Sequence, residues 1–134
     1  VAFFVGAILA LSVGLFATFS RLDRDRAFYP TVTIVIASYY ALFALIGDSA
    51  RALAMESVAI LAFIVLSVVG FRKSLWLIVA ALAAHGLFDL VHPHLISNPG
   101  VPAWWPPFCF SFDVVAAAYL AWLLLQSRTG ATAT

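Results

Sequence analysis

Charge is scarce in this chain. Only 10% of the 134 residues are Asp, Glu, Lys or Arg, whereas soluble domains carry about a quarter. The formal net charge of +1 and the lack of a basic stripe or base-stacking motif exclude a nucleic-acid partner. Hydrophobic residues make up 65% of the chain, which indicates a protein whose solvent is lipid.

Cysteine is almost absent as well. Cys109 stands alone, so an internal disulfide is excluded and the redox compartment cannot be read from cysteines. A basic segment before the first apolar run is also missing, and the positive charges follow that run instead. We therefore interpret residues 1–20 as a membrane span and not as a signal peptide.

The chain contains five long apolar runs. Each holds roughly 17–20 residues, enough to cross about 30 Å of hydrocarbon as a helix. Backbone polar groups must be satisfied within a segment in lipid, which favours helices. The sequence predicts an all-α fold, a single domain over residues 1–134 that forms a bundle of five transmembrane helices. The predicted spans are about 1–20, 31–47, 52–70, 75–92 and 108–126.

The basic residues lie almost entirely on one side of this arrangement. Six of the seven fall in the first and third connections or the C-terminal tail, and such a bias is typical of the cytoplasmic side. We expect an N-terminus outside, a cytoplasmic C-terminus and insertion in a bacterial cytoplasmic membrane. The six residues are Arg21, Arg24, Arg26, Arg72, Lys73 and Arg128, and Arg51 is on the other side.

This orientation is testable by cysteine labelling. His94→Cys and Trp105→Cys should react with a membrane-impermeant thiol reagent from outside, since both positions lie in the proline-rich connection of residues 92–107. Arg24→Cys serves as the control and should be protected. Labelling of positions 94 and 105 from the cytoplasmic side would overturn the orientation.

All three histidines fall within HGLFDLVHPH, residues 85–94, at the end of an apolar run. Spacings of four and seven residues place His85, Asp89 and His92 on one face of a helix. His94 follows Pro93 and is expected just past the end of that helix.

Three acids lie inside the predicted spans, on three different helices. A rise of 1.5 Å per residue places Glu56, Asp89 and Asp113 in one layer near the outer leaflet, within about 5 Å of each other in depth. Each ionisable residue inside a span costs roughly 2.5–3.5 kcal/mol. We therefore expect the acids to face each other, the histidines or a wet cavity.

Histidine nitrogen and carboxylate oxygen together indicate a metal site for Zn, Fe or Cu. A His and a carboxylate one helical turn apart can bind the same ion. With an open coordination position the site would suit a metal-dependent enzyme on a lipid-like or small apolar substrate, with Glu56 and Asp113 as candidate catalytic residues. The candidate ligands are His85, Asp89, His92, His94, Glu56 and Asp113.

Other interpretations remain open. The same residues could form a purely structural hydrogen-bonded network between helices, or a proton or cation path. The chain could also be an accessory subunit of a larger membrane complex, with lipids, other membrane subunits or a second copy as partners. AALAAHGLF resembles the Ala-x-x-x-His pattern of antenna helices, which would place bacteriochlorophyll on His85. Cys109 is interpreted as packing, and Tyr39 and Tyr40 as packed or hydrogen-bonded.

HGLFDLVH, NPGVPAWWPPFC and DRAFYPT together resemble a family of small bacterial polytopic membrane proteins that is known as a domain of unknown function. The resemblance covers most of the chain and implies no activity, substrate or cofactor. It stresses His85, Asp89, His92, Pro99, Gly100, Trp104 and Trp105.

Overall fold

The computed structural model describes residues 1–126, which form five α-helices and one short 3-10 turn with no strand. All five helices are long and apolar enough to span a membrane. The predicted all-α fold with five spans is therefore confirmed. The elements are α1 (Ala2–Ser20), η1 (Leu22–Arg24), α2 (Phe28–Ile46), α3 (Ala50–Lys73), α4 (Trp76–Leu95) and α5 (Trp105–Leu125).

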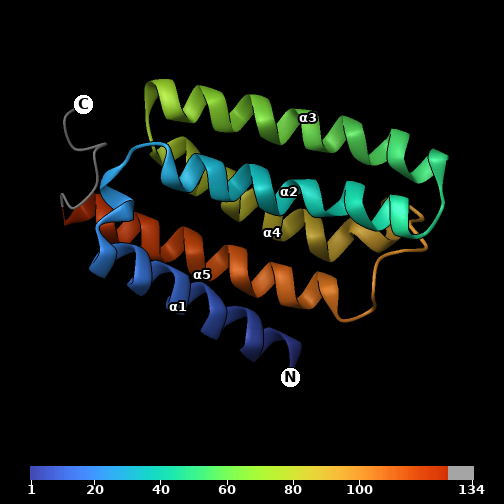
Figure 1. Ribbon diagram of the computed structural model, residues 1–134, viewed down its shortest axis with the longest axis horizontal. Helices are drawn as coiled ribbons and strands as arrows, with labels where there is room; N and C mark the ends of the chain where they lie inside the picture. The colour runs from blue at the N-terminus through green and yellow to red at the C-terminus, as the bar shows by residue number, and fades with distance from the viewer. Residues whose placement is uncertain (127–134) are drawn as a thin grey trace.

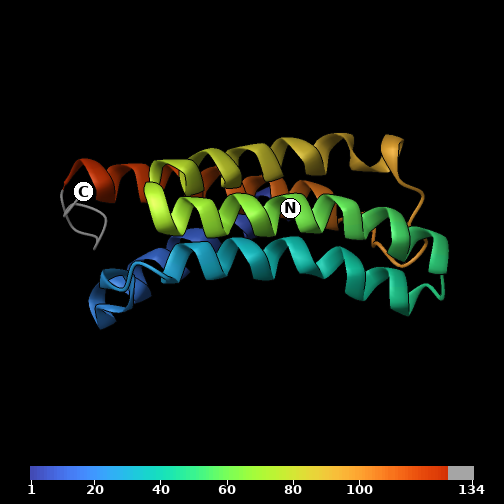
Figure 2. The ribbon, with the colours of Figure 1, turned by 90° about the horizontal axis from the view of Figure 1, so that it is seen from above.

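The helices form an antiparallel bundle in which α4 lies behind α2 and beside α5 (Figure 1). Helix α4 packs against α2, α3 and α5, whereas α1 packs on the far side of α5. Seen from above, α3 lies beside both α2 and α4 (Figure 2). Because α4 packs against both α3 and α5, its polar face contacts acids from these two helices.

The basic residues are distributed unequally between the two ends of the bundle. The connections 21–27 and 74–75 lie at one end, and the connections 47–49 and 96–104 lie at the other (Figure 1). The first end carries five basic residues and the second carries Arg51, which matches the separation expected from the sequence. Arg128 lies outside the described residues. Which end is cytoplasmic stays a prediction.

Helix boundaries differ from the predicted ones by up to three residues, and proline accounts for two of these differences. Helix α4 continues through Pro93 to Leu95, so the prediction that His94 lies past the helix end is wrong. A proline in the last turn removes one backbone donor only, and the helix still closes with a bond from the Ile96 N–H to the His92 carbonyl at 2.9 Å. Helix α5 begins at Trp105 rather than 108, because prolines are tolerated in the first turn, where backbone N–H groups have no partner within the helix.

The connection between α4 and α5 folds back over the end of α2. A Cβ atom added to Gly100 would lie 1.7 Å from the carbonyl oxygen of Phe43, so this contact requires glycine. The backbone of the connection therefore packs directly on α2, and the preceding Asn98 reaches into the bundle.

Candidate metal centre

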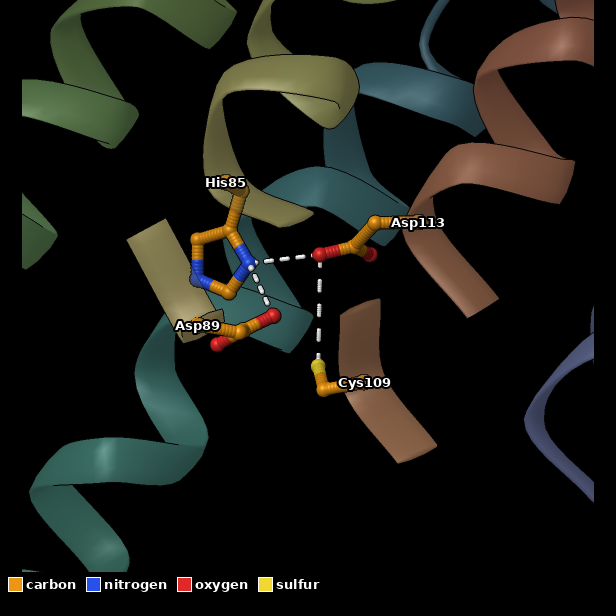
Figure 3. A group of neighbouring side chains, drawn as sticks. All are labelled: His85, Asp89, Cys109 and Asp113. Atoms are coloured by element: carbon orange, nitrogen blue, oxygen red, sulfur yellow. Dashed lines mark hydrogen bonds and ion pairs between the residues drawn. The ribbon is translucent and has the colours of Figure 1, made fainter. Parts of the chain in front are cut away.

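Four buried side chains from two helices form a compact group of metal-ligand type. His85 and Asp89 come from α4, and Cys109 and Asp113 come from α5 (Figure 3). One ligand atom from each residue lies within 4.8 Å of all the others. None of the four residues is more than 2% exposed. The protein thus has a buried His/Asp/Cys group that could hold a metal ion.

The spacing of the residues and one glycine bring this group together. On both helices the two members are four residues apart, so they project from the same face one turn from each other. Gly86 lets the helices approach, because a Cβ there would lie 3.3 Å from both the Asp113 Cβ and the Phe110 carbonyl oxygen. A larger residue at position 86 would push α5 away from His85.

Hydrogen bonds connect the group internally and to α2. A hydrogen bond of 2.6 Å joins Nδ1 of His85 to Oδ2 of Asp113, and Asp89 Oδ2 lies 3.4 Å from the same nitrogen. The Tyr40 hydroxyl donates to Oδ1 of Asp89 at 2.6 Å. The Cys109 thiol donates to Oδ2 of Asp113 over a longer distance of 3.9 Å. Three helices therefore hold the two carboxylates in place.

Two carboxylate oxygens of this group lack a hydrogen bond. Oδ2 of Asp89 and Oδ1 of Asp113 are buried and have no hydrogen-bond partner among the described residues. Buried polar atoms in folded proteins are nearly always paired. The only ion pairs that these acids make within residues 1–126 are with His85, which is charged only if protonated. The group therefore has more acceptors than donors, as a cation site would.

A second buried pair lies next to this group. Nε2 of His92 and Oε1 of Glu56 are 2.6 Å apart, and the Asn98 side chain donates to the same oxygen at 3.0 Å. Asn98 also donates to the Tyr40 carbonyl at 3.1 Å, while the Tyr40 ring stacks on His92 with centroids 4.0 Å apart. The proline-rich connection thus covers this pair and supplies one of its donors.

The acids that the sequence places in a single layer pair with two different histidines. His85 and His92 are seven residues apart, or about 10 Å along α4. Asp113 pairs with the first histidine and Glu56 pairs with the second, so the acids divide between two levels. His85 lies near mid-helix, with nine residues of α4 before it and ten after it.

Six ligands were proposed from the sequence. Three of them belong to the buried group of His85, Asp89, Cys109 and Asp113, and three do not. His85, Asp89 and Asp113 belong to it, whereas Glu56 and His92 form the second pair. His94 is exposed and belongs to neither. Its side chain points away from the bundle because the stripe at positions 85, 89 and 92 occupies the buried face of α4.

Sequence reasoning missed two members of these networks. Cys109 was interpreted as packing, although its spacing of four residues from Asp113 was a signal for a shared site. Asn98 lies in a connection with no periodicity, so nothing in the sequence pointed it toward Glu56. Tyr40 was expected to be packed or hydrogen-bonded, and it is both.

Comparisons with known proteins add no relative: no family model matches the chain, and no curated protein or solved structure is significantly similar to it. The fold and the site define the class: a membrane-spanning helical protein with a buried group able to bind metal. The resemblance of its motifs to a family of bacterial membrane proteins stays a prediction.

The buried pair of His92 and Glu56 leads to a prediction about stability, for which His94 is the control. His92→Ala removes the closest partner of the fully buried Glu56 carboxylate, and breaking a buried pair costs about 3–5 kcal/mol. We expect a clear drop in the thermal unfolding midpoint in mild detergent. His94→Ala, two residues away and exposed, should leave the midpoint unchanged. Equal effects of the two changes would contradict the pairing.

Proposed function

We propose that the protein is a membrane metalloprotein, whose buried group binds one transition metal ion, most favourably Zn²⁺. The observation that carries this proposal is the convergence of four ligand atoms within 4.8 Å, with two carboxylate oxygens left unbonded. The set of one imidazole, two carboxylates and one thiol matches the nitrogen, oxygen and sulfur ligands that zinc prefers. The same donor types keep iron and copper as alternatives.

The distances within the group support a tetrahedral ion. Ligand bonds of about 2.0–2.3 Å imply ligand atoms roughly 3.3–3.8 Å apart at the corners of a tetrahedron. The His85–Asp89 separation of 3.4 Å already meets this value. The His85–Asp113 contact of 2.6 Å would open by less than 1 Å, and the thiol is 3.9 Å from Asp113. Small side-chain movements therefore suffice to admit the ion.

Charge also favours a bound cation. Both acids of the group are fully buried in a helix bundle of membrane-spanning length, where an uncompensated carboxylate is expensive. A divalent ion would offset this cost, and it would deprotonate a coordinating thiol. The hydrogen bond from Tyr40 would then act on a ligand from outside the coordination shell and hold Asp89 in orientation.

Cys109 decides between a structural and a catalytic ion. Structural zinc sites use four protein ligands, whereas catalytic sites keep one position open. Cys109 makes the longest contact of the group, and it also lines an apolar groove on the protein surface. With Cys109 bound, the site is closed. Without it, the open position would face the groove, which is where a lipid-like substrate would be activated.

A proton or cation path is less well supported. Toward the end of the bundle that carries most of the basic residues, the interior is filled by fully buried apolar side chains rather than by a polar chain. Asp23, Tyr29, Thr33 and Ser67 are also buried toward this end, but within residues 1–126 none of them forms a side-chain hydrogen bond to the group around His85. The apolar residues are Leu75, Ile78, Leu82, Leu120 and Leu123.

A pigment on His85 has little room. The imidazole is 1% exposed, its Nδ1 is bonded to Asp113, and the Phe63 ring packs on it with centroids 4.7 Å apart. A flat macrocycle would have to displace these neighbours. The accessory-subunit role without pigment remains compatible with a metal site.

Metal content is the direct test of the proposal. The protein expressed in medium supplemented with Zn²⁺ and purified without chelators should retain about one equivalent per chain by elemental analysis, because the site supplies a full ligand set. His85→Ala and Asp113→Asn should each lose the metal. A wild-type protein that retains none would refute the proposal.

Controls separate loss of ligand from loss of fold. His94→Ala changes the same residue type at an exposed position and should keep the full metal content. Circular dichroism and size-exclusion chromatography should show that the metal-free variants remain helical and monodisperse. Metal loss in His94→Ala to the same degree would mean that the ion binds elsewhere.

Cobalt substitution tests the role of Cys109. If the thiolate is a ligand, the Co²⁺-loaded protein should show a near-ultraviolet sulfur-to-metal charge-transfer band that Cys109→Ser lacks. Retention of cobalt without this band in the wild type would identify a three-residue site with an open position. Ser111→Ala, on the same helix and outside the group, is the matched control.

A further inference from the structure

An apolar groove of about 640 Å³ runs between α1 and α2, with α5 as its floor. Although α1 and α2 are consecutive, the main packing partner of α1 is α5 and that of α2 is α3. The two helices are therefore spread apart toward the lipid. Residues lining the groove include Leu9, Val13, Val32, Val35, Phe108 and Phe112.

We propose that this groove binds one acyl chain of a membrane phospholipid, whose headgroup lies at the 21–27 end of the bundle. The groove shares Cys109 with the candidate metal centre, but binding of the acyl chain requires no metal ion. The bound lipid would belong to the leaflet at that end, and its chain would lie between two membrane-spanning helices, α1 and α2.

The length of the groove matches one leaflet. Its lining on α2 extends over twelve residues from Phe28 to Tyr39, which span about 16 Å along the helix. Half of a hydrocarbon core of about 30 Å is nearly the same length. The ring of Trp105 packs against Tyr39 with centroids 5.2 Å apart and closes the far end. A chain that enters from the 21–27 end would thus extend as far as Tyr39 and Trp105.

The volume of the groove is small for a helix and suits a single acyl chain. One turn of helix with its side chains, 5.4 Å long and about 11 Å across, fills roughly 500 Å³. A groove of about 640 Å³ would hold little more than one turn of a helix from a second copy or another subunit. A single flexible chain fits such a volume, which lies within the range of small-ligand sites.

The polar end of the groove suits a phospholipid headgroup. Leu22 and Asp25 line the groove at the short connection between α1 and α2. Arg21 and Arg24 flank them and are exposed. Guanidinium groups bind phosphate through paired hydrogen bonds, and basic residues at a membrane surface attract anionic lipid. The connection at this end of the groove thus carries two exposed arginines beside Asp25, which is itself part of the lining.

Photo-crosslinking tests this proposal. The full chain is placed in nanodiscs of phosphatidylcholine with a small fraction of phosphatidylglycerol that carries a diazirine at mid-chain. We expect crosslinks on residues 31–36 and 108–112 to exceed, several-fold, those on the exposed face of α3 around Val58 and Leu61. Labelling that is equal at these places would refute a bound chain.

Matched tryptophan variants show whether the groove itself is responsible. Val35→Trp places bulk in the groove at a side chain that is 49% exposed, and should reduce the groove crosslinks several-fold. Val58→Trp adds the same bulk on α3 and should leave them unchanged. Unchanged groove labelling in Val35→Trp would overturn the proposal.

The contribution of Arg21 and Arg24 can be measured separately. Replacing Arg21 and Arg24 together by alanine should abolish any preference of the groove for the phosphatidylglycerol probe over a phosphatidylcholine probe with the same chain. If the wild type shows no such preference, the headgroup does not lie at the 21–27 end and the proposed orientation is wrong.

Discussion

The hydrogen bond between His85 and Asp113 is the constraint on which the rest of this bundle depends. Membrane-spanning segments have no water to solvate a carboxylate, so Asp113 must find its partner on another helix. That requirement fixes the register of α5 against α4, and Gly86 makes the close approach possible. Because the main packing partner of α1 is α5, the position of the first helix follows from the same contact.

Tyr40 connects the two polar levels of the interior. Its hydroxyl bonds Asp89 in the metal-ligand group, while its ring stacks on His92 and its carbonyl accepts from Asn98. The two levels therefore share Tyr40. Because its aromatic side chain is rigid, a shift at one level would move the side chains at the other. Networks of this kind specify one packing arrangement when every member is satisfied, and they are costly when a member is left unpaired.

The sequence was sufficient for the fold but only partly for the site. Five apolar runs and the distribution of arginine determine the number of spans and their relative direction, because lipid leaves helices as the solution for such segments. Spacing along α4 also placed His85, Asp89 and His92 on one buried face. Relative depth between helices could not be derived, since it depends on packing: Asp113 and Glu56 pair with different histidines about 10 Å apart along α4.

Burial has a consequence for how a metal would reach this site. Its four ligands lie near the middle of the bundle and are at most 2% exposed, so an ion could enter the folded protein only through apolar surroundings. A hydrated divalent ion loses far more solvation there than the apolar lining of the groove returns. Loading before α4 and α5 close on each other avoids that barrier. A metal bound in this way would exchange slowly and lock the two helices together, which is the behaviour of a structural site.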